Sequence, residues 1–240
     1  MHKRLIQLLI ITFTVMLLSG CLYPESEKTK NQIPHEEQLE TVQVAVEQYK
    51  EENNGLVPIK TKPNDTPVFE KYLIDFDLLR EANILAETPG NAFENGGHYQ
   101  YALLDPETDP EIKLIDLRMT EDLRRVNVQL DIYRSGQLYP PFGERIGKDL
   151  YTVDSDELGL EESATVGSPY SEKELPILMN SDGDLFVDYR PELYEALEEY
   201  DHSFEPGDDL RFLLADHTPF LPAYSLPYTI EDGEPVFMEE

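Results

Sequence analysis

Positive charge is scarce in this sequence. It contains 19 Lys and Arg against 49 Asp and Glu, which gives a formal net charge of −30 at pH 7. Binding to nucleic acid requires a basic surface, so we exclude DNA and RNA as partners. Because the acidic residues are spread along the chain, two interpretations stay open. They form a surface for divalent cations or a basic partner, or they only keep an exported protein soluble in saline or alkaline surroundings.

Cysteine occurs once, at Cys21, so the chain cannot form an internal disulfide bond. Many small exported domains depend on disulfides, whereas this chain must be stabilised by its hydrophobic core alone. A hydrophobic content of 40%, with 14 Tyr and 10 Phe, is sufficient for such a core and is not typical of a disordered acidic chain. The length fits one large domain or two small ones.

A membrane-spanning run of apolar residues is also missing. The run Leu5–Leu18 contains Thr12 and Thr14 and is shorter than the roughly 20 residues that cross a bilayer. It follows Lys3 and Arg4 and precedes small residues, which is the order of a bacterial export signal. We therefore expect residues 1–20 to be a signal peptide and residues 21–34 a flexible spacer.

The four residues at the cleavage point, Leu18-Ser19-Gly20-Cys21, resemble the lipobox of bacterial lipoproteins. The resemblance implies cleavage before Cys21 and diacylation of its sulfur, and two acyl chains are enough for stable anchoring. The expected location is the extracytoplasmic face of the cell membrane, with the membrane as a partner through the lipid on Cys21. An ordinary cleaved signal peptide is the alternative, but it would leave a secreted protein with a free thiol.

Motifs of catalysis and cofactor binding are absent from the sequence. There is no Gly-x-Ser-x-Gly elbow, Walker loop or dinucleotide fingerprint, so we expect a protein that is not an enzyme and holds no cofactor. The weak metal candidates are Asp182, Asp184 and Asp188, because closely spaced carboxylates at a Gly turn can bind calcium. The calcium-loop pattern fails, however, since its sixth position is Leu185 and its twelfth is Pro191. A hairpin turn at Asp-Gly is the favoured interpretation.

The periodicity predicts an α+β fold with two similar helix-plus-hairpin units, packed as one body with a C-terminal helical and extended segment. The expected units are residues 35–118 and 119–190, and the segment from 191 to 240 adds a helix and a Pro-rich tail that packs on the domain. Two predicted helices carry the same apolar stripe at a constant offset: Leu39, Val42, Val46 and Tyr49, then Leu123, Val126, Leu130 and Tyr133. Hairpins are predicted over Tyr99–Leu117 and Pro176–Tyr189. The alternative is that any two amphipathic helices share this spacing.

Three stretches are similar to the YphF-like group of Bacillus cell-surface lipoproteins: Gly20-Cys21-Leu22-Tyr23-Pro24, Gln38-Leu39 and Gly55-Leu56-Val57-Pro58-Ile59-Lys60. Since that group has no settled activity, the resemblance supports the location. Our first functional prediction is a structural or protein-interaction lipoprotein with a possible envelope protein as partner. A ligand- or cation-binding lipoprotein is the second prediction, and a cell-envelope hydrolase is the third.

Overall fold

The structure is a computed structural model that describes residues 35–137 and 139–238. The predicted signal peptide, Cys21 and the spacer lie outside these residues. Within the described ranges, no helix is long and apolar enough to cross a membrane.

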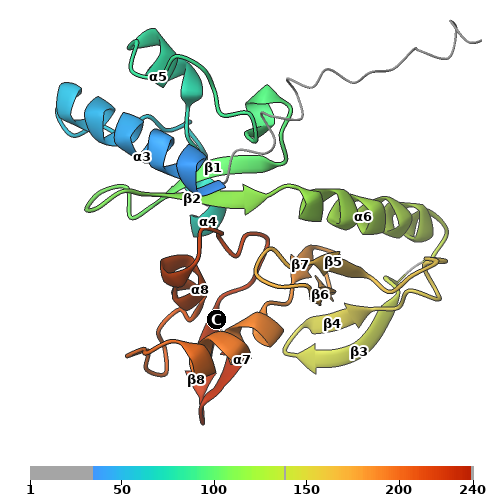
Figure 1. Cartoon of the computed structure of the whole chain (residues 1–240). Helices are drawn as coiled ribbons and strands as arrows, with labels where there is room; N and C mark the ends of the chain where they lie inside the picture. Colours follow the sequence, from blue (N-terminus) through green and yellow to red (C-terminus); the bar gives the residue numbers. More distant parts are fainter. Residues whose placement is uncertain (1–34, 138, 239–240) are drawn as a thin grey trace, which may run out of the picture.

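The first unit consists of helices followed by a β-hairpin, and it occupies the upper part of Figure 1. Its elements are α3 (His35–Glu52), α4 (Val68–Lys71), α5 (Phe76–Glu81), the 3₁₀ helix η1 (Phe93–Asn95), β1 (Tyr99–Leu104) and β2 (Glu111–Asp116). The carboxylate of Asp75 accepts a hydrogen bond of 3.0 Å from the Asp77 amide and caps α5. The predicted hairpin is confirmed, with Tyr99 opposite Asp116 and Leu104 opposite Glu111.

Helix α3 packs on one face of this hairpin. Val42 and Val46 are fully buried with Tyr101 and Leu114, whereas Val44 points outward and is 58% exposed. The Gln43 side chain fixes the two elements together, because its Oε1 accepts a 2.8 Å hydrogen bond from the Ile112 amide. The predicted stripe of α3 is therefore its core face.

The second unit begins with a long helix and contains a five-stranded sheet. Its elements are α6 (Arg118–Gly136), β3 (Phe142–Gly147), β4 (Leu150–Val153), β5 (Thr165–Gly167), β6 (Glu174–Asn180) and β7 (Leu185–Val187). The strand order is β3-β4-β6-β5, and β7 also pairs with β6. Strands β3, β4 and β5 were not predicted, so the second unit is more than a helix and a hairpin.

The stripe of α6 repeats the arrangement of α3. Val126 and Leu130 are buried in the core cluster that also contains residues of β5, β6 and β7, and Val128, which corresponds to Val44, is 47% exposed. The helix begins at Arg118, and its N-cap residue is Leu117. Both units thus share the order of helix and hairpin, and both helices bury the second and third positions of their stripes. Helix α3 packs against β2 of its own hairpin, whereas α6 packs mainly against β5, which lies outside the predicted hairpin.

The last part of the chain joins the two units. It contains α7 (Arg190–Glu199), α8 (Arg211–His217), β8 (Tyr228–Glu231) and β9 (Glu234–Phe237). Residues of α7 and α8 belong to the same core cluster as β6 and β7, so the expected boundary at residue 190 falls inside one core. The Pro-rich tail packs on the domain as predicted, with Leu221, Ala223 and Tyr228 buried.

Residues 218–225 form a C-terminal strap between the two sheets. Leu114 of β2 donates to the Pro219 carbonyl and accepts from the Leu221 amide, both at 2.8 Å. Further along the strap, the Tyr224 carbonyl accepts a 2.8 Å hydrogen bond from the Val187 amide at the end of β7. The strap therefore covers the edge of the first hairpin and contacts the second.

Three helices start with the same Asp-x-Arg pair. The pairs are Asp116 with Arg118 at α6, Asp188 with Arg190 at α7, and Asp209 with Arg211 at α8. In each pair, the Asp Oδ1 accepts the Arg backbone N–H at 3.0–3.1 Å and also accepts the Arg Nε, while Oδ2 accepts Nη2. Such bidentate, charge-assisted contacts are among the stronger hydrogen bonds in proteins. The pairs fix where each helix begins.

Candidate interaction surface

The predicted metal candidates do not converge. Asp182 and Asp184 lie in the turn between β6 and β7, where the Asp184 amide donates to Asn180 Oδ1 at 2.8 Å. Asp188 is buried and bound to Arg190 in the pair at the start of α7. The structure thus places the Asp-Gly sequence in a hairpin turn. Among the residues it describes, no group of three His, Cys, Asp or Glu side chains is arranged to hold a metal ion.

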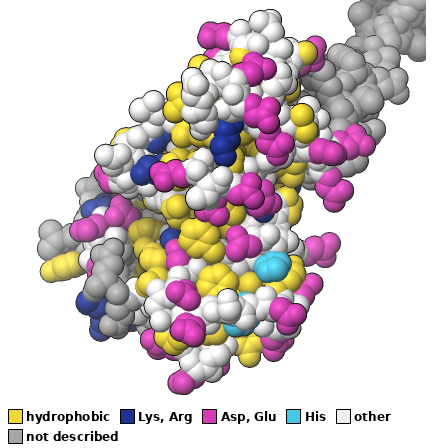
Figure 2. All heavy atoms as spheres, turned by 90° about the vertical axis from the view of Figure 1, so that its left-hand side faces the viewer, with side chains coloured by type: hydrophobic (Ala, Val, Ile, Leu, Met, Phe, Trp, Pro, Cys, Tyr) yellow, Lys and Arg dark blue, Asp and Glu magenta, His cyan; other side chains and the backbone are white. Residues whose placement is uncertain are grey.

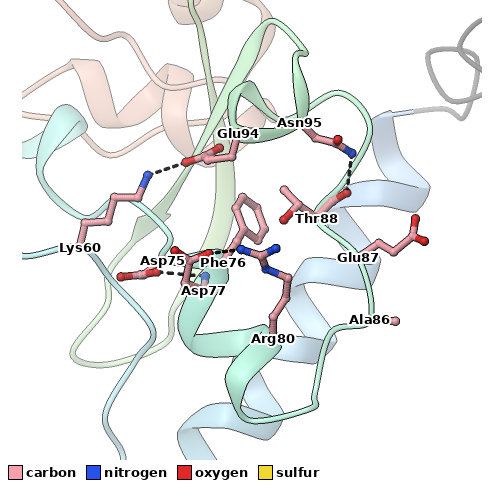
Figure 3. A pocket seen from close by; sticks show the side chains of 10 residues that line it. All are labelled: Lys60, Asp75, Phe76, Asp77, Arg80, Ala86, Glu87, Thr88, Glu94 and Asn95. Atoms are coloured by element: carbon pink, nitrogen blue, oxygen red, sulfur yellow. Dashed lines mark hydrogen bonds and ion pairs between the residues drawn. The ribbon is translucent and has the colours of Figure 1, made fainter.

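A charged hollow of about 380 Å³ lies beside α5 in the first unit (Figure 3). Lys60 on one side pairs with Glu94 at 2.5 Å, and Arg80 pairs with Asp77 on the other. Figure 3 shows the ring of Phe76 between these two pairs. Both cations are already held by carboxylates of the same hollow, so an anionic ligand would have to displace an internal partner.

Two further hollows lie at the waist of the molecule, where the first unit meets the C-terminal part. The first has a volume of about 330 Å³ and lies between α4, the end of β1 and the start of α8. It is lined by Val68, Tyr72, Leu103 and Phe212, and by the loop that follows β1. The ring of Phe212 packs on Phe69 with the ring centres 5.1 Å apart, which makes this wall rigid and apolar.

The second hollow has a volume of about 440 Å³ and lies between α3, β2 and the residues that follow α8. Its apolar lining is Leu39, Ile112 and Pro219. Figure 2 shows hydrophobic side chains gathered across the middle of this side of the molecule, with acidic side chains above and below them. We call the two hollows, with the carboxylates around them, the waist surface.

The carboxylates of the waist surface are exposed. They belong to Glu36, Glu40, Asp105, Glu107, Glu111 and Asp216. Asp105 borders the first hollow, and Glu111 and Asp216 border the second. Burial raises the pKa of Asp216, and the negative charges of Asp105 and Glu111 raise it further against the opposing effect of Lys113 and His217. Carboxylates therefore border both hollows.

Few basic side chains oppose these carboxylates. The side chain of Lys113 is only 3% exposed, and its Nζ contacts Glu111 Oε1 at 2.7 Å and the Thr218 carbonyl at 3.0 Å. His217 also lines the second hollow, and Lys50 Nζ donates to the Thr108 carbonyl at the first at 3.2 Å, so the carboxylates outnumber the basic groups around the waist. The surface combines apolar hollows with an excess of negative charge.

Sequence reasoning did not find this surface. The sequence predicts the hairpin over Tyr99–Leu117 and a C-terminal helix and tail, but not that they meet. The residues that line the hollows come from α3, α4, the hairpin and α8, which are far apart in the sequence. The acidic composition of the loop was the one signal available.

Taken together, the molecule is an α+β protein of two units, each with a helix and a hairpin, and its candidate site is the waist surface. Residues 35–116 match the family model of the YphF family N-terminal domain. The match ends at Asp116, the first residue of the pair that begins α6. This match confirms the predicted resemblance to the YphF-like group for the first unit. No curated protein and no solved structure matches the chain.

Proposed function

We propose that this protein is an extracytoplasmic lipoprotein, held to the cell membrane by lipid on Cys21, that binds another protein of the envelope. The anchoring part is supported by Lys3, Arg4, the apolar run and Leu18-Ser19-Gly20-Cys21. The interaction part is supported by the waist surface, since exposed apolar hollows with a polar rim are typical of protein contacts. That surface is the observation that carries the proposal.

The anchoring is tested by the variant Cys21→Ser. Without the thiol no lipid can be attached, so the variant is expected in the soluble fraction after cell breakage while the parent sediments with membranes. Ser26→Ala, a few residues later in the expected spacer, is the matched control and should stay with the membranes. If Cys21→Ser still sediments and high salt does not release it, the lipid is not the anchor.

Binding of a small polar ligand is the second candidate function. It is favoured by the charged hollow beside α5, which lies inside the residues that match the family. Exchange of Arg80 to Gln would remove one of its two cations without disturbing the core, because that side chain is 49% exposed. A ligand whose binding depends on Arg80 and not on the waist surface would favour this candidate over the first.

A further inference from the structure

We infer that the waist surface binds a basic segment of a partner protein in which Lys or Arg residues alternate with apolar residues. The inference rests on the proposed interaction role and names the chemistry of the partner. Each of the two hollows is within the range of about 300–1,000 Å³ that is usual for binding sites. Apolar side chains of the segment fill them.

The first step is the apolar contact. Val68 is 38% exposed at the mouth of the first hollow, beside the half-buried Tyr72 and Phe212. Leu39 and Pro219 give the second hollow a similar lining. Covering such surface removes apolar area from water and is favourable. The register of the hairpin places Leu103, at the first hollow, opposite Ile112, at the second.

The second step is the charge. Asp105 borders the first hollow, and Glu111 and Asp216 border the second, so a segment that fills both hollows passes these carboxylates. A Lys or Arg at that point gains an opposite charge, whereas an acidic residue is repelled. Nucleic acids and anionic lipid surfaces are repelled for the same reason.

The third step is the backbone. The edge of β2 beside the waist is already paired with the strap through Leu114, and the Ile112 amide is bound to Gln43. A partner strand therefore cannot extend this sheet at β2. Recognition of the partner segment therefore depends on its side chains, that is, on the alternation of basic and apolar residues.

The experiment measures binding of labelled peptides to the purified full chain in a neutral detergent by fluorescence anisotropy, with protein-free micelles as the blank. The probe is a peptide of alternating Lys and Leu. A Glu-Leu peptide lacks the positive charge, and a Lys-Ser peptide lacks the apolar residues. We expect only the Lys-Leu peptide to bind well, with an affinity that falls as salt is added.

Two matched pairs of variants locate the binding. Asp216→Asn at the waist should weaken the Lys-Leu peptide about three- to fivefold, whereas Asp131→Asn on the exposed face of α6 should leave it unchanged. Val68→Ser should weaken it by a similar factor, whereas Val128→Ser, which is comparably exposed, should not. All four positions are on the surface, so each variant is expected to fold.

Several results would overturn the inference. Equal effects of Asp216→Asn and Asp131→Asn would mean that the peptide binds the acidic protein without a defined site. Equal binding of the Lys-Ser peptide would remove the role of the hollows. If only calcium binds, and Asp216→Asn abolishes it, the waist is a cation site. None of these outcomes depends on Cys21, so failure here is distinct from failure of the anchoring.

Discussion

Replacing Asp188 by Ala removes the acceptor that begins α7. Asp188 is only 3% exposed, and its carboxylate accepts the Arg190 backbone N–H at 3.1 Å and the guanidinium at 2.6 and 2.9 Å. The hydrogen bond to Asp188 also raises the pKa of Arg190. The variant therefore leaves the Arg190 backbone N–H without its acceptor and the guanidinium without its counter-ion.

The expected loss can be worked out from these contacts. Breaking a buried ion pair by removing one partner costs about 3–5 kcal/mol. Arg190 is 34% exposed and lies over the Phe237 ring at 4.5 Å, so it can turn partly to water and lower that cost. The lost hydrogen bond to the Arg190 backbone N–H adds about 1 kcal/mol. We expect Asp188→Ala to lower the free energy of unfolding by about 3 kcal/mol, a large part of the usual ~5–15 kcal/mol.

Urea unfolding of the full chain, followed by far-UV circular dichroism, measures this loss. Asp188→Asn keeps an acceptor for the backbone and should cost less than Asp188→Ala. The matched control is Asp122→Ala, which breaks an exposed pair with Arg125 at 3.2 Å and should cost at most about 1 kcal/mol. The reasoning is refuted if Asp188→Ala and Asp122→Ala destabilise the protein equally.

Two other substitutions test the core and the waist. Val46→Asp places a charge in the sealed contact of α3 with its hairpin and should unfold the first unit, whereas Val44→Asp on the outer face should change the urea midpoint little. Burial raises the pKa of Asp216 in the folded chain, so the folded form binds this proton more tightly and the charged carboxylate costs stability at neutral pH. Asp216→Asn should therefore be more stable than the parent at about pH 7, and the gap should shrink as the pH falls towards about 4. A gap that widens on acidification would contradict the assigned direction.

Elements with a strong local signal were predictable from the sequence. The stripes of α3 and α6 have helical spacing, and Asp75 is a typical cap for α5. The first hairpin alternates as strands do, and the Asp-Gly turn before β7 was predicted correctly. Each of these features depends on residues close together in the chain. The membrane anchor at Cys21 stays a prediction.

Other elements depend on contacts that the sequence does not display. Strands β4 and β5 have only four and three residues, and most of β3 is exposed, so neither apolar alternation nor length marks them. They form because β6 offers pairing partners for β4 and β5. The β8–β9 hairpin could have been predicted, since Asp232 and Gly233 both have positive φ in an Asp-Gly turn. The Asp-x-Arg pairs are visible as a repeated pattern only once their common position at helix starts is known.

The first unit completes its backbone pairing only through residues near the end of the chain. Residues near 220 follow Leu114 by about a hundred positions, so the strap can pair with β2 only once nearly the whole chain is available. Until then, Leu114 on the β2 edge lacks its strap partners, and unpaired edges invite aggregation. A premature stop before residue 218 would thus expose an edge in one unit and remove a contact from the other. The truncated chain would then lack a strap contact in both units, and both units would be open to proteolysis.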